Sequence, residues 1–417
     1  MNYYSDIHFK KVEELFQHNL NDDFACFALW KSARPFHDKI RELLHNSFSI
    51  VLETEIEWSE EYFKNNALRL YESPIYIDAV AEENKSGHYK KIGDNRFIII
   101  IVKDKHPKYT YAKSVSGKIE MSNLNIVNAK FQMRSWIQAE SGEKYAVHST
   151  NNIFEFFFQV PLLLGTNRFN RILNGEKLDE SNIKKDLEGA GGWESYTQMF
   201  DILNHTSNYL IQRGFESLPN SNPEMDIDFL TDHFQRLASA LGLRQRRNKP
   251  YKGNLRVGND EISIDIRYVG DKYYNTAWAK DMLDRKKYRE GLFIPREDDY
   301  FFSLLYHAKV QKPNVKNKYV PILNQIASSL EFDWYKTSML SNDEEIGKLI
   351  KGYFSAHSYV YEKPIDSGVY NNKKVSLFLP TLNHSMQKKV KYGRLKKIAR
   401  KILPERVIKM IKKKLKK

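Results

Sequence analysis

Hydrophobic and polar residues alternate along several short segments of this chain, and the alternation predicts its strands. Residues 48–58 alternate as on a half-buried strand, and the β-branched run at 97–102 is typical of a central strand. Residues 225–230 and 262–268 alternate in the same way much later in the chain. Further strands are expected within 108–148 and at 210–215 and 254–257.

Apolar residues at helical spacing predict the helices between these strands. They fall at 31–45, 60–70, 156–164, 195–210, 231–241, 275–290, 298–311 and 316–330. Gly165 is expected to end the helix at 156–164, although Pro161 lies inside it. Short strands embedded among helices indicate an α+β fold.

A polar stretch at 167–192, which contains three glycines near its end, is the expected connection between two domains. Residues 1–166 are predicted to form a separate α/β-type N-terminal domain of unknown role. Residues 193–385 are predicted to form a second domain, a mixed sheet with flanking helices. Residues 388–417 form a third segment, a tail of different composition.

Charge separates that tail from the rest of the chain. The 417 residues carry a formal net charge of +14. Residues 388–417 hold fifteen basic residues and one acid, so the preceding 387 residues are neutral overall. The single cysteine, Cys26, excludes a disulfide framework and a cysteine-rich zinc site and suits a reducing cytosol.

The tail has apolar residues at helical spacing with Lys and Arg on its other faces, which predicts a basic amphipathic helix. Such a helix binds an anionic membrane surface, with a contribution of ~1 kcal/mol per nearby cation. The expected membrane-binding residues are Lys396, Lys397, Arg400, Lys401, Lys409 and Lys412. Nucleic acid is the rival partner, but the apolar stripe disfavours it, because a phosphate-tracking arm needs no such face. A solvated helix packed on the body is the other alternative.

Candidate chemistry lies in the second domain, on the two alternating segments. Asp226 and Asp228 are two residues apart, so on a strand they share a face. Asp265 lies between isoleucines on the other segment. Clustered carboxylates repel unless a cation lies between them. Mg²⁺ or Mn²⁺ held by these oxygens would suit phosphoryl or nucleotidyl transfer, whereas the alternative is a pair of solvated turn residues.

Residues 208–232, with this Asp-x-Asp, and the later Asp265 resemble the nucleotidyltransferase superfamily with the polymerase-β-type fold. The most similar members are the predicted nucleotidyltransferases and fukutin-like phosphotransferases of bacterial capsule and lipopolysaccharide gene clusters. The resemblance covers about residues 195–330 and implies a nucleotidyltransferase-like mixed sheet and metal-dependent transfer from a nucleotide donor. The family usually has a Gly-Ser pair before its aspartates, where this chain has Arg213 and Gly214.

Other residues are candidate substrate ligands. Arg213 could grip a phosphate with its planar fork or pair with Glu216. Asp271 could hold a sugar hydroxyl or cap a turn. His307 and Lys312 could face donor phosphates, whereas the alternative for His307 is a hydrogen-bonded histidine in the core.

A second polar cluster lies in the N-terminal domain. A His-Ser pair followed by a capped helix could bind an anion at the helix N-terminus, or its polar residues could serve only as a helix cap. The residues of this cluster are Lys130, Arg134, Trp136, His148, Ser149, Asn151, Asn152 and Glu155.

Together with the resemblance, these patterns predict a cytoplasmic transferase, peripheral on the inner face of the cell membrane. It would move a nucleotidyl or phosphate-linked polyol or sugar group from an activated nucleotide to a lipid-linked or glycan acceptor in surface polysaccharide biosynthesis. Asp226, Asp228 and Asp265 would bind the metal, and Asp265 could instead act as the base. The alternatives are a glycosyltransferase that uses Asp-x-Asp with a sugar nucleotide, a nucleotidyl-transferring toxin or defence enzyme, and a non-catalytic assembly protein that binds membrane or nucleic acid.

Overall fold

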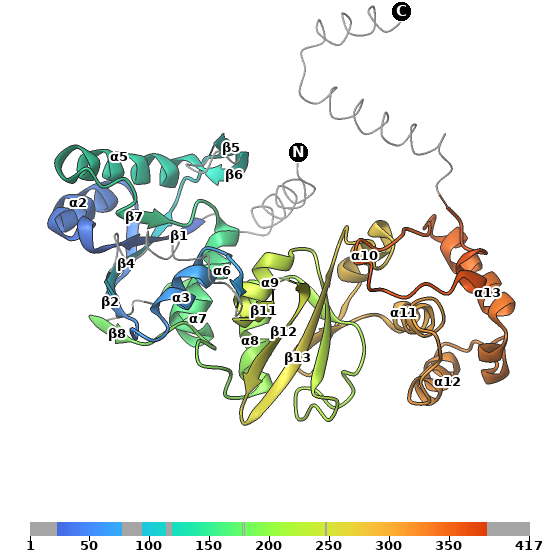
Figure 1. The fold of residues 1–417 in the computed structure, drawn as a ribbon. Coiled ribbons are helices and arrows are strands. Elements are labelled where there is room, and N and C mark those ends of the chain that lie inside the picture. Colours follow the sequence, from blue (N-terminus) through green and yellow to red (C-terminus); the bar gives the residue numbers. More distant parts are fainter. Residues whose placement is uncertain are drawn as a thin grey trace, which may run out of the picture. The chain divides into compact units, whose positions relative to one another are not determined.

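The computed structural model describes residues 23–76, 94–113 and 119–381, apart from residues 177, 179 and 247. The chain forms two compact units (Figure 1). Among the described residues, unit 1 runs to Val269 and also contains Lys280–Arg296, and unit 2 comprises Gly270–Ala279 and the residues from Glu297 to 381. The described residues combine helices with mixed sheets, which confirms the predicted α+β class. The units divide the chain at places other than the predicted domain boundaries.

Sheet A of unit 1 has five strands in the order β7-β1-β4-β2-β8. Its strands are β1 (Asp23–Leu29), β2 (Ser49–Glu57), β4 (Arg96–Asp104), β7 (Val147–Ser149) and β8 (Asn182–Lys184). β4 pairs antiparallel with both β1 and β2, so the β-branched run at 97–102 is central, as predicted. Every residue of β1 is buried, which indicates that both faces of the sheet are covered.

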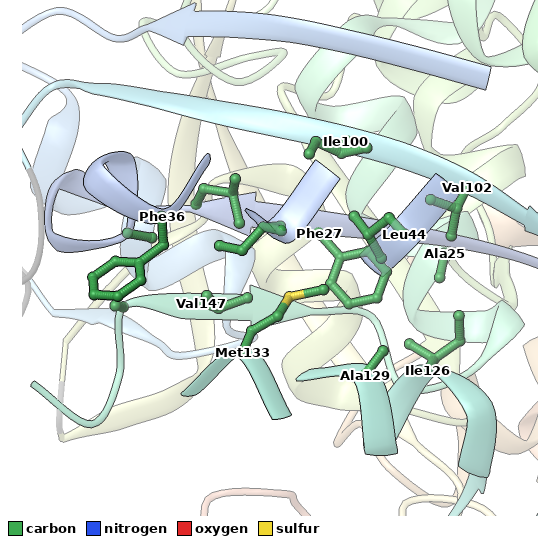
Figure 2. Close-up of a cluster of buried hydrophobic side chains, with 14 of the residues drawn as sticks. Ala25, Phe27, Phe36, Leu44, Ile100, Val102, Ile126, Ala129, Met133 and Val147 are labelled. Atoms are coloured by element: carbon green, nitrogen blue, oxygen red, sulfur yellow. The ribbon is translucent and has the colours of Figure 1, made fainter. Parts of the chain in front are cut away.

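Helices α2 (His37–Ser47) and α5 (Leu124–Ser141) cover one face of sheet A. Figure 2 shows Phe27 of β1, Leu44 of α2 and Met133 of α5 in one hydrophobic cluster. Each of these side chains is fully buried, and burial of one such side chain stabilises the fold by about 1.5–3 kcal/mol. The helices thus hold the sheet through hydrophobic contacts.

Helix α6 (Ile153–Leu164) packs against β1 and against helices α7 (Thr166–Leu173) and α8 (Tyr196–Thr206). Its sequence is apolar on nearly all sides, and a helix of that kind is enclosed on all sides. Phe156 stacks on Phe24 of β1, with ring centroids 5.5 Å apart. The helix ends just before Gly165, as predicted, and the glycine has a φ of 79°, a backbone conformation that favours glycine.

Sheet B of unit 1 has six strands in the order β3-β11-β12-β13-β10-β9. They are β3 (Ile75–Tyr76), β9 (Tyr209–Ile211), β10 (Asp226–Thr231), β11 (Arg244–Arg246), β12 (Lys249–Val257) and β13 (Asp260–Tyr268). β10 lies parallel to β13, whereas β9 and β12 are antiparallel to their neighbours, so the sheet is mixed. The strands predicted at 225–230 and 262–268 are confirmed.

The two faces of sheet B differ near β10 and β13. Ile227, Phe229, Ile264 and Ile266 are buried on the face where helix α9 (Phe234–Leu241) packs against β13. The residues between them on each strand are polar and more exposed towards the strand starts. The alternation in the sequence therefore has a direct cause, since successive side chains point to opposite faces of a strand.

The N-terminal part of the chain continues into sheet B. Helix α3 (Phe63–Leu70) leads to β3, which pairs parallel with β11. The fully buried Arg69 of α3 donates from Nε to Ser239 O at 2.8 Å and from Nη2 to Ala240 O at 2.7 Å. Both carbonyls lie at the C-terminal end of α9, where the helix dipole favours a cation. The two regions predicted as separate domains therefore share a sheet and a buried arginine.

Unit 2 is built mainly from helices. They are α11 (Glu297–Lys309), α12 (Tyr319–Ser329), η2 (Thr337–Ser341), α13 (Asp343–Ala356) and α14 (Lys373–Ser376), and α10 (Thr276–Asp284) begins in this unit. Trp278 is fully buried, with ring centroids 5.6 Å from those of Tyr306 and Tyr353. Aromatic packing of this kind forms the core of the unit.

Helix α5 corrects the prediction of strands across residues 108–148. In that range the described strands are β5 (Tyr109–Lys113), β6 (Ile119–Asn123) and the short β7. Asn123 caps α5 by accepting a hydrogen bond from the backbone N–H of Asn125. The buried positions Ile126, Met133 and Ile137 follow a helical repeat, which fits the face turned to sheet A.

Two further segments differ from the prediction. The helix expected to run to residue 290 ends at Asp284, and β14 (Lys287–Arg289) and β15 (Leu292–Ile294) form a hairpin. Glu290 and Gly291 join them with positive φ at both residues, the backbone of a tight hairpin turn. The stretch at 167–192, expected to be a connection, contains α7 and β8, and β8 extends sheet A beside β2.

The predicted tail, residues 388–417, lies outside the described residues. Lys396, Lys397, Arg400, Lys401, Lys409 and Lys412 are therefore not placed. Across the portion of the chain that is described, we find no helix with both the length and the apolar character to cross a bilayer.

Candidate active site on the open face of sheet B

The three candidate aspartates lie on one face of two adjacent strands. Asp226 and Asp228 are on β10, and Asp228 lies directly opposite Asp265 of β13. Directly opposed residues of paired strands point to the same side, and neighbouring strands lie about 4.8 Å apart. The isoleucines and phenylalanine between these acids fill the covered face, so the carboxylates are directed to the open one.

Basic side chains neutralise two of these aspartates. Arg213 Nη2 lies 2.9 Å from Asp228 Oδ2. Lys252 Nζ lies 3.2 Å from Asp265 Oδ2, and Arg267 Nε lies 3.0 Å from Asp265 Oδ1. Lys252 is directly opposite Asp265 on β12, and Arg267 follows it by two residues on β13. The site therefore combines three carboxylates with three cations on one polar face.

Asp228 lies in a half-buried and charged environment. Its burial raises the pKa of the carboxyl group above the ordinary value, and the negative charges of Asp265 and Asp226 act in the same direction. Arg213 and, more weakly, Lys252 oppose that shift. A cation close to Asp228 therefore favours its charged form against the effect of burial.

The donor set suits a hard divalent cation in chemical type, since all three groups offer carboxylate oxygens and lie on one face. Asp265 Oδ1 is buried and accepts no hydrogen bond from the described residues, although Arg267 is beside it. In their present rotamers the side chains turn to Arg and Lys, and among the described residues no three His, Cys, Asp or Glu form a ready metal-ligand group. Asp226, Asp228 and Asp265 would hold the ion once those ion pairs open.

The predicted substrate ligands fall in two places. Arg213, just after β9, belongs to the aspartate cluster through its ion pair with Asp228. Asp271, His307 and Lys312 lie in unit 2. The buried Asp271 Oδ1 accepts the backbone N–H of Tyr273 at 2.8 Å, the geometry of a turn cap. Lys312 is half-buried.

His307 is a buried histidine in the core of unit 2. Its Nδ1 lies 2.9 Å from the hydroxyl of Tyr273 and its Nε2 lies 3.4 Å from the hydroxyl of Tyr319. Both ring nitrogens therefore have tyrosine partners. This placement matches the alternative interpretation of a hydrogen-bonded core histidine.

Most residues of the polar cluster in the N-terminal region contact other protein groups. Asn152 Oδ1 caps α6 by accepting the N–H of Glu155, and Lys130 contacts Asn151. Burial raises the pKa of Glu155 to about 7 and lowers that of His148 to about 3. The helix N-terminus that was a candidate anion site thus has its own cap. Three further members of the cluster are placed as follows: Arg134 donates to Val147 O, Ser149 Oγ is buried, and Trp136 packs under Lys39.

Lys252 and Arg267 were not among the site residues predicted from the sequence. Arg267 follows Asp265 by two residues in an alternating segment, so their shared face could have been read from the chain. Lys252 required the register of β12 against β13, and the strand was predicted only from residue 254. The polar alternation at Lys252, Asn254 and Arg256 carried that information.

The chain was also compared with known proteins. No family model matches it, and no curated protein or solved structure shows a significant match.

Proposed function

We propose that the chain is a metal-dependent transferase that moves a nucleotidyl or phosphate-linked polyol or sugar group from an activated nucleotide donor. The observation that carries the proposal is the register of β10 and β13, which sets Asp228 opposite Asp265 with Asp226 on the same open face. Carboxylates that converge from neighbouring strands are a common way to hold Mg²⁺ at phosphate chemistry. The Asp-x-Asp resemblance to nucleotidyltransferases supports the same class.

In this proposal Asp226 and Asp228 bind Mg²⁺ or Mn²⁺, and Asp265 completes the site or accepts the proton of an acceptor hydroxyl. The bound ion would neutralise developing charge on the transferred phosphate. The protein itself orients the carboxylates, because the isoleucine side of each strand is fixed in the core. The cations Arg213, Lys252 and Arg267 supply positive charge beside the donor phosphates.

The proposed setting is bacterial capsule or lipopolysaccharide biosynthesis at the inner face of the cell membrane. Support comes from the basic tail, residues 388–417, whose apolar stripe and fifteen cations suit an anionic lipid surface. The tail would bring the enzyme to a lipid-linked or glycan acceptor. Flotation with anionic and neutral vesicles, with and without residues 388–417, tests this step. Retention on DNA without lipid binding would favour the nucleic-acid alternative.

The metal site is tested by thermal unfolding with Mn²⁺ and a panel of nucleotide donors. We expect the wild-type chain to be stabilised by Mn²⁺ and further by one donor, because ligands that bind only the folded state raise its stability. Asp228→Asn should lose both shifts. Glu261→Gln is the matched control, since it removes one negative charge from the same face of β13. An unshifted wild-type chain, or an unchanged Asp228→Asn, would rule out the proposal.

A further inference from the structure

The ion pair between Arg213 and Asp228 occupies a carboxylate that the proposed function needs for metal. Arg213 Nη2 lies 2.9 Å from Asp228 Oδ2, and this arginine side chain is only 13% exposed. We propose that Arg213 exchanges partners, so that it neutralises Asp228 before metal binds and then moves to a phosphate group of the donor. This inference rests on the proposed function and names Arg213 as the residue that couples metal to anion.

Arg213 is better placed for this exchange than the other two cations. Arg267 is 7% exposed and its guanidinium also lies 5.2 Å from the centre of the Tyr251 ring, so it is held from two sides. Lys252 projects from a regular strand and is 54% exposed, so its charge is largely solvated. Arg213 lies just past the end of β9, where its Nη1 also donates to Oε1 of the neighbouring Gln212 at 3.4 Å, a longer contact than its ion pair. Gly214 after it has a φ of 70°.

The chemistry of the guanidinium suits both partners. Its planar fork binds a carboxylate or a phosphate with two parallel hydrogen bonds. Asp228 is flanked by the charges of Asp226 and Asp265, so the cation is needed while no metal is bound. A divalent ion at these oxygens would repel the guanidinium, and an anionic phosphate would relieve that repulsion. Metal and phosphate should therefore bind with positive coupling, and Arg213 should carry part of it.

Two binding measurements test the exchange with the full chain. The affinity for Mn²⁺ alone is followed by the loss of the free-ion electron paramagnetic resonance signal. The affinity for radiolabelled pyrophosphate is measured by equilibrium dialysis at saturating Mn²⁺. In Arg213→Gln we expect Mn²⁺ to bind about three- to tenfold more tightly, because its competitor is gone, and pyrophosphate to bind at least about tenfold more weakly.

Arg244→Gln is the matched control, because Arg244 is exposed on the same face of sheet B, three strands away from β10. It should leave both affinities within about twofold of wild type. Arg213→Lys should retain part of the pyrophosphate affinity, and it serves as the second variant if Arg213→Gln does not fold. For Arg213→Lys, Mn²⁺ binding should stay near wild type while pyrophosphate binding falls about threefold or more, since lysine lacks the planar fork.

The outcomes separate this inference from the proposed function. A wild-type chain that binds no Mn²⁺ overturns both. Suppose that the wild-type chain binds both ligands. If Arg213→Gln then changes neither affinity, or changes both in the same direction, only the exchange is overturned. If only Arg213→Lys folds, unchanged pyrophosphate binding in that variant overturns it. Opposite changes in Arg213→Gln support an arginine that leaves a carboxylate for a phosphate.

Discussion

Sheet A and sheet B lie in the same unit but differ in how their two faces are covered. Helices cover both faces of sheet A, and all seven residues of β1 are buried. In sheet B the covered face of β10 and β13 is apolar, while the opposite face carries Asp226, Asp228 and Asp265. The difference shows where this fold can tolerate clustered charge, because carboxylates on an open face keep access to water, ions and ligands.

Asp23 of sheet A is buried, whereas Asp228 of sheet B is half-buried. Asp23 of β1 is enclosed in sheet A, where it accepts hydrogen bonds from Tyr109 and Asn123. Asp228 on sheet B forms an ion pair with Arg213, and we propose that this arginine can pair with a phosphate instead. The first arrangement fixes structure, whereas the second leaves the carboxylate ready to exchange its partner.

The largest expected loss of stability comes from a substitution in α6, the helix that covers the second face of sheet A. Phe156→Ala should lower the free energy of unfolding by about 3–5 kcal/mol, because it removes a fully buried ring that packs on Phe24. Urea unfolding measures this loss. Phe131→Ala on α5 is the matched control, since that ring is 41% exposed, and its cost should be about 1 kcal/mol or less. Equal costs would contradict the enclosed position of α6.

Asp23 gives a pH-dependent effect of intermediate size. Burial is the main cause that raises its pKa to about 6, and the nearby Asp104 adds to the shift. The ordinary unfolded value is about 3.9, so the folded state binds the proton more tightly between these values. Stability from this group is present below pH ~4 and is lost as pH rises through ~6, by roughly 2–3 kcal/mol.

Asp23→Asn isolates this contribution, because the amide does not titrate in that range. Other groups change stability over the same range, among them His148 with a pKa of about 3, whose slope has the opposite sign. From pH 4 to pH 7, the free energy of unfolding of the wild type should therefore fall by roughly 2–3 kcal/mol relative to that of Asp23→Asn. Parallel stability curves for the two proteins would show that Asp23 is not titrating there.

The sequence predicted those elements whose hydrophobic pattern is local and strong. The central strand β4 and the two aspartate-bearing strands were recognised, because a run of isoleucines and a strict alternation are both typical of strands. Helix α5 was missed although Ile126, Met133 and Ile137 follow a helical repeat, because polar residues interrupt its apolar face and leave the repeat weak. The hairpin at 287–294 was missed because its first strand and Glu290 lay inside the helix predicted at 275–290.

Pairings between distant segments could not be predicted. The pairing of β3 with β11 and of β8 with β2 depends on how helices bring remote segments together, and each of these pairings spans only two or three residues. The candidate site likewise has one part that follows from local spacing and one that depends on distant segments. The shared face of Asp226 and Asp228 follows from spacing, whereas the contact of Arg213 with Asp228 depends on the loop between β9 and β10.

The smallest expected change in stability comes from a substitution on the open face of sheet B. Ser263 lies opposite Asp226 on β13 and is exposed, so Ser263→Ala should change the free energy of unfolding by less than about 0.5 kcal/mol. Ile264→Ala, one residue further along the strand, should cost about 2–5 kcal/mol, because its side chain is fully buried. Chemical denaturation of both variants measures the contrast. A cost above about 1 kcal/mol for Ser263→Ala would mean that the face of the aspartates is covered in solution, and a covered face could not admit a nucleotide donor.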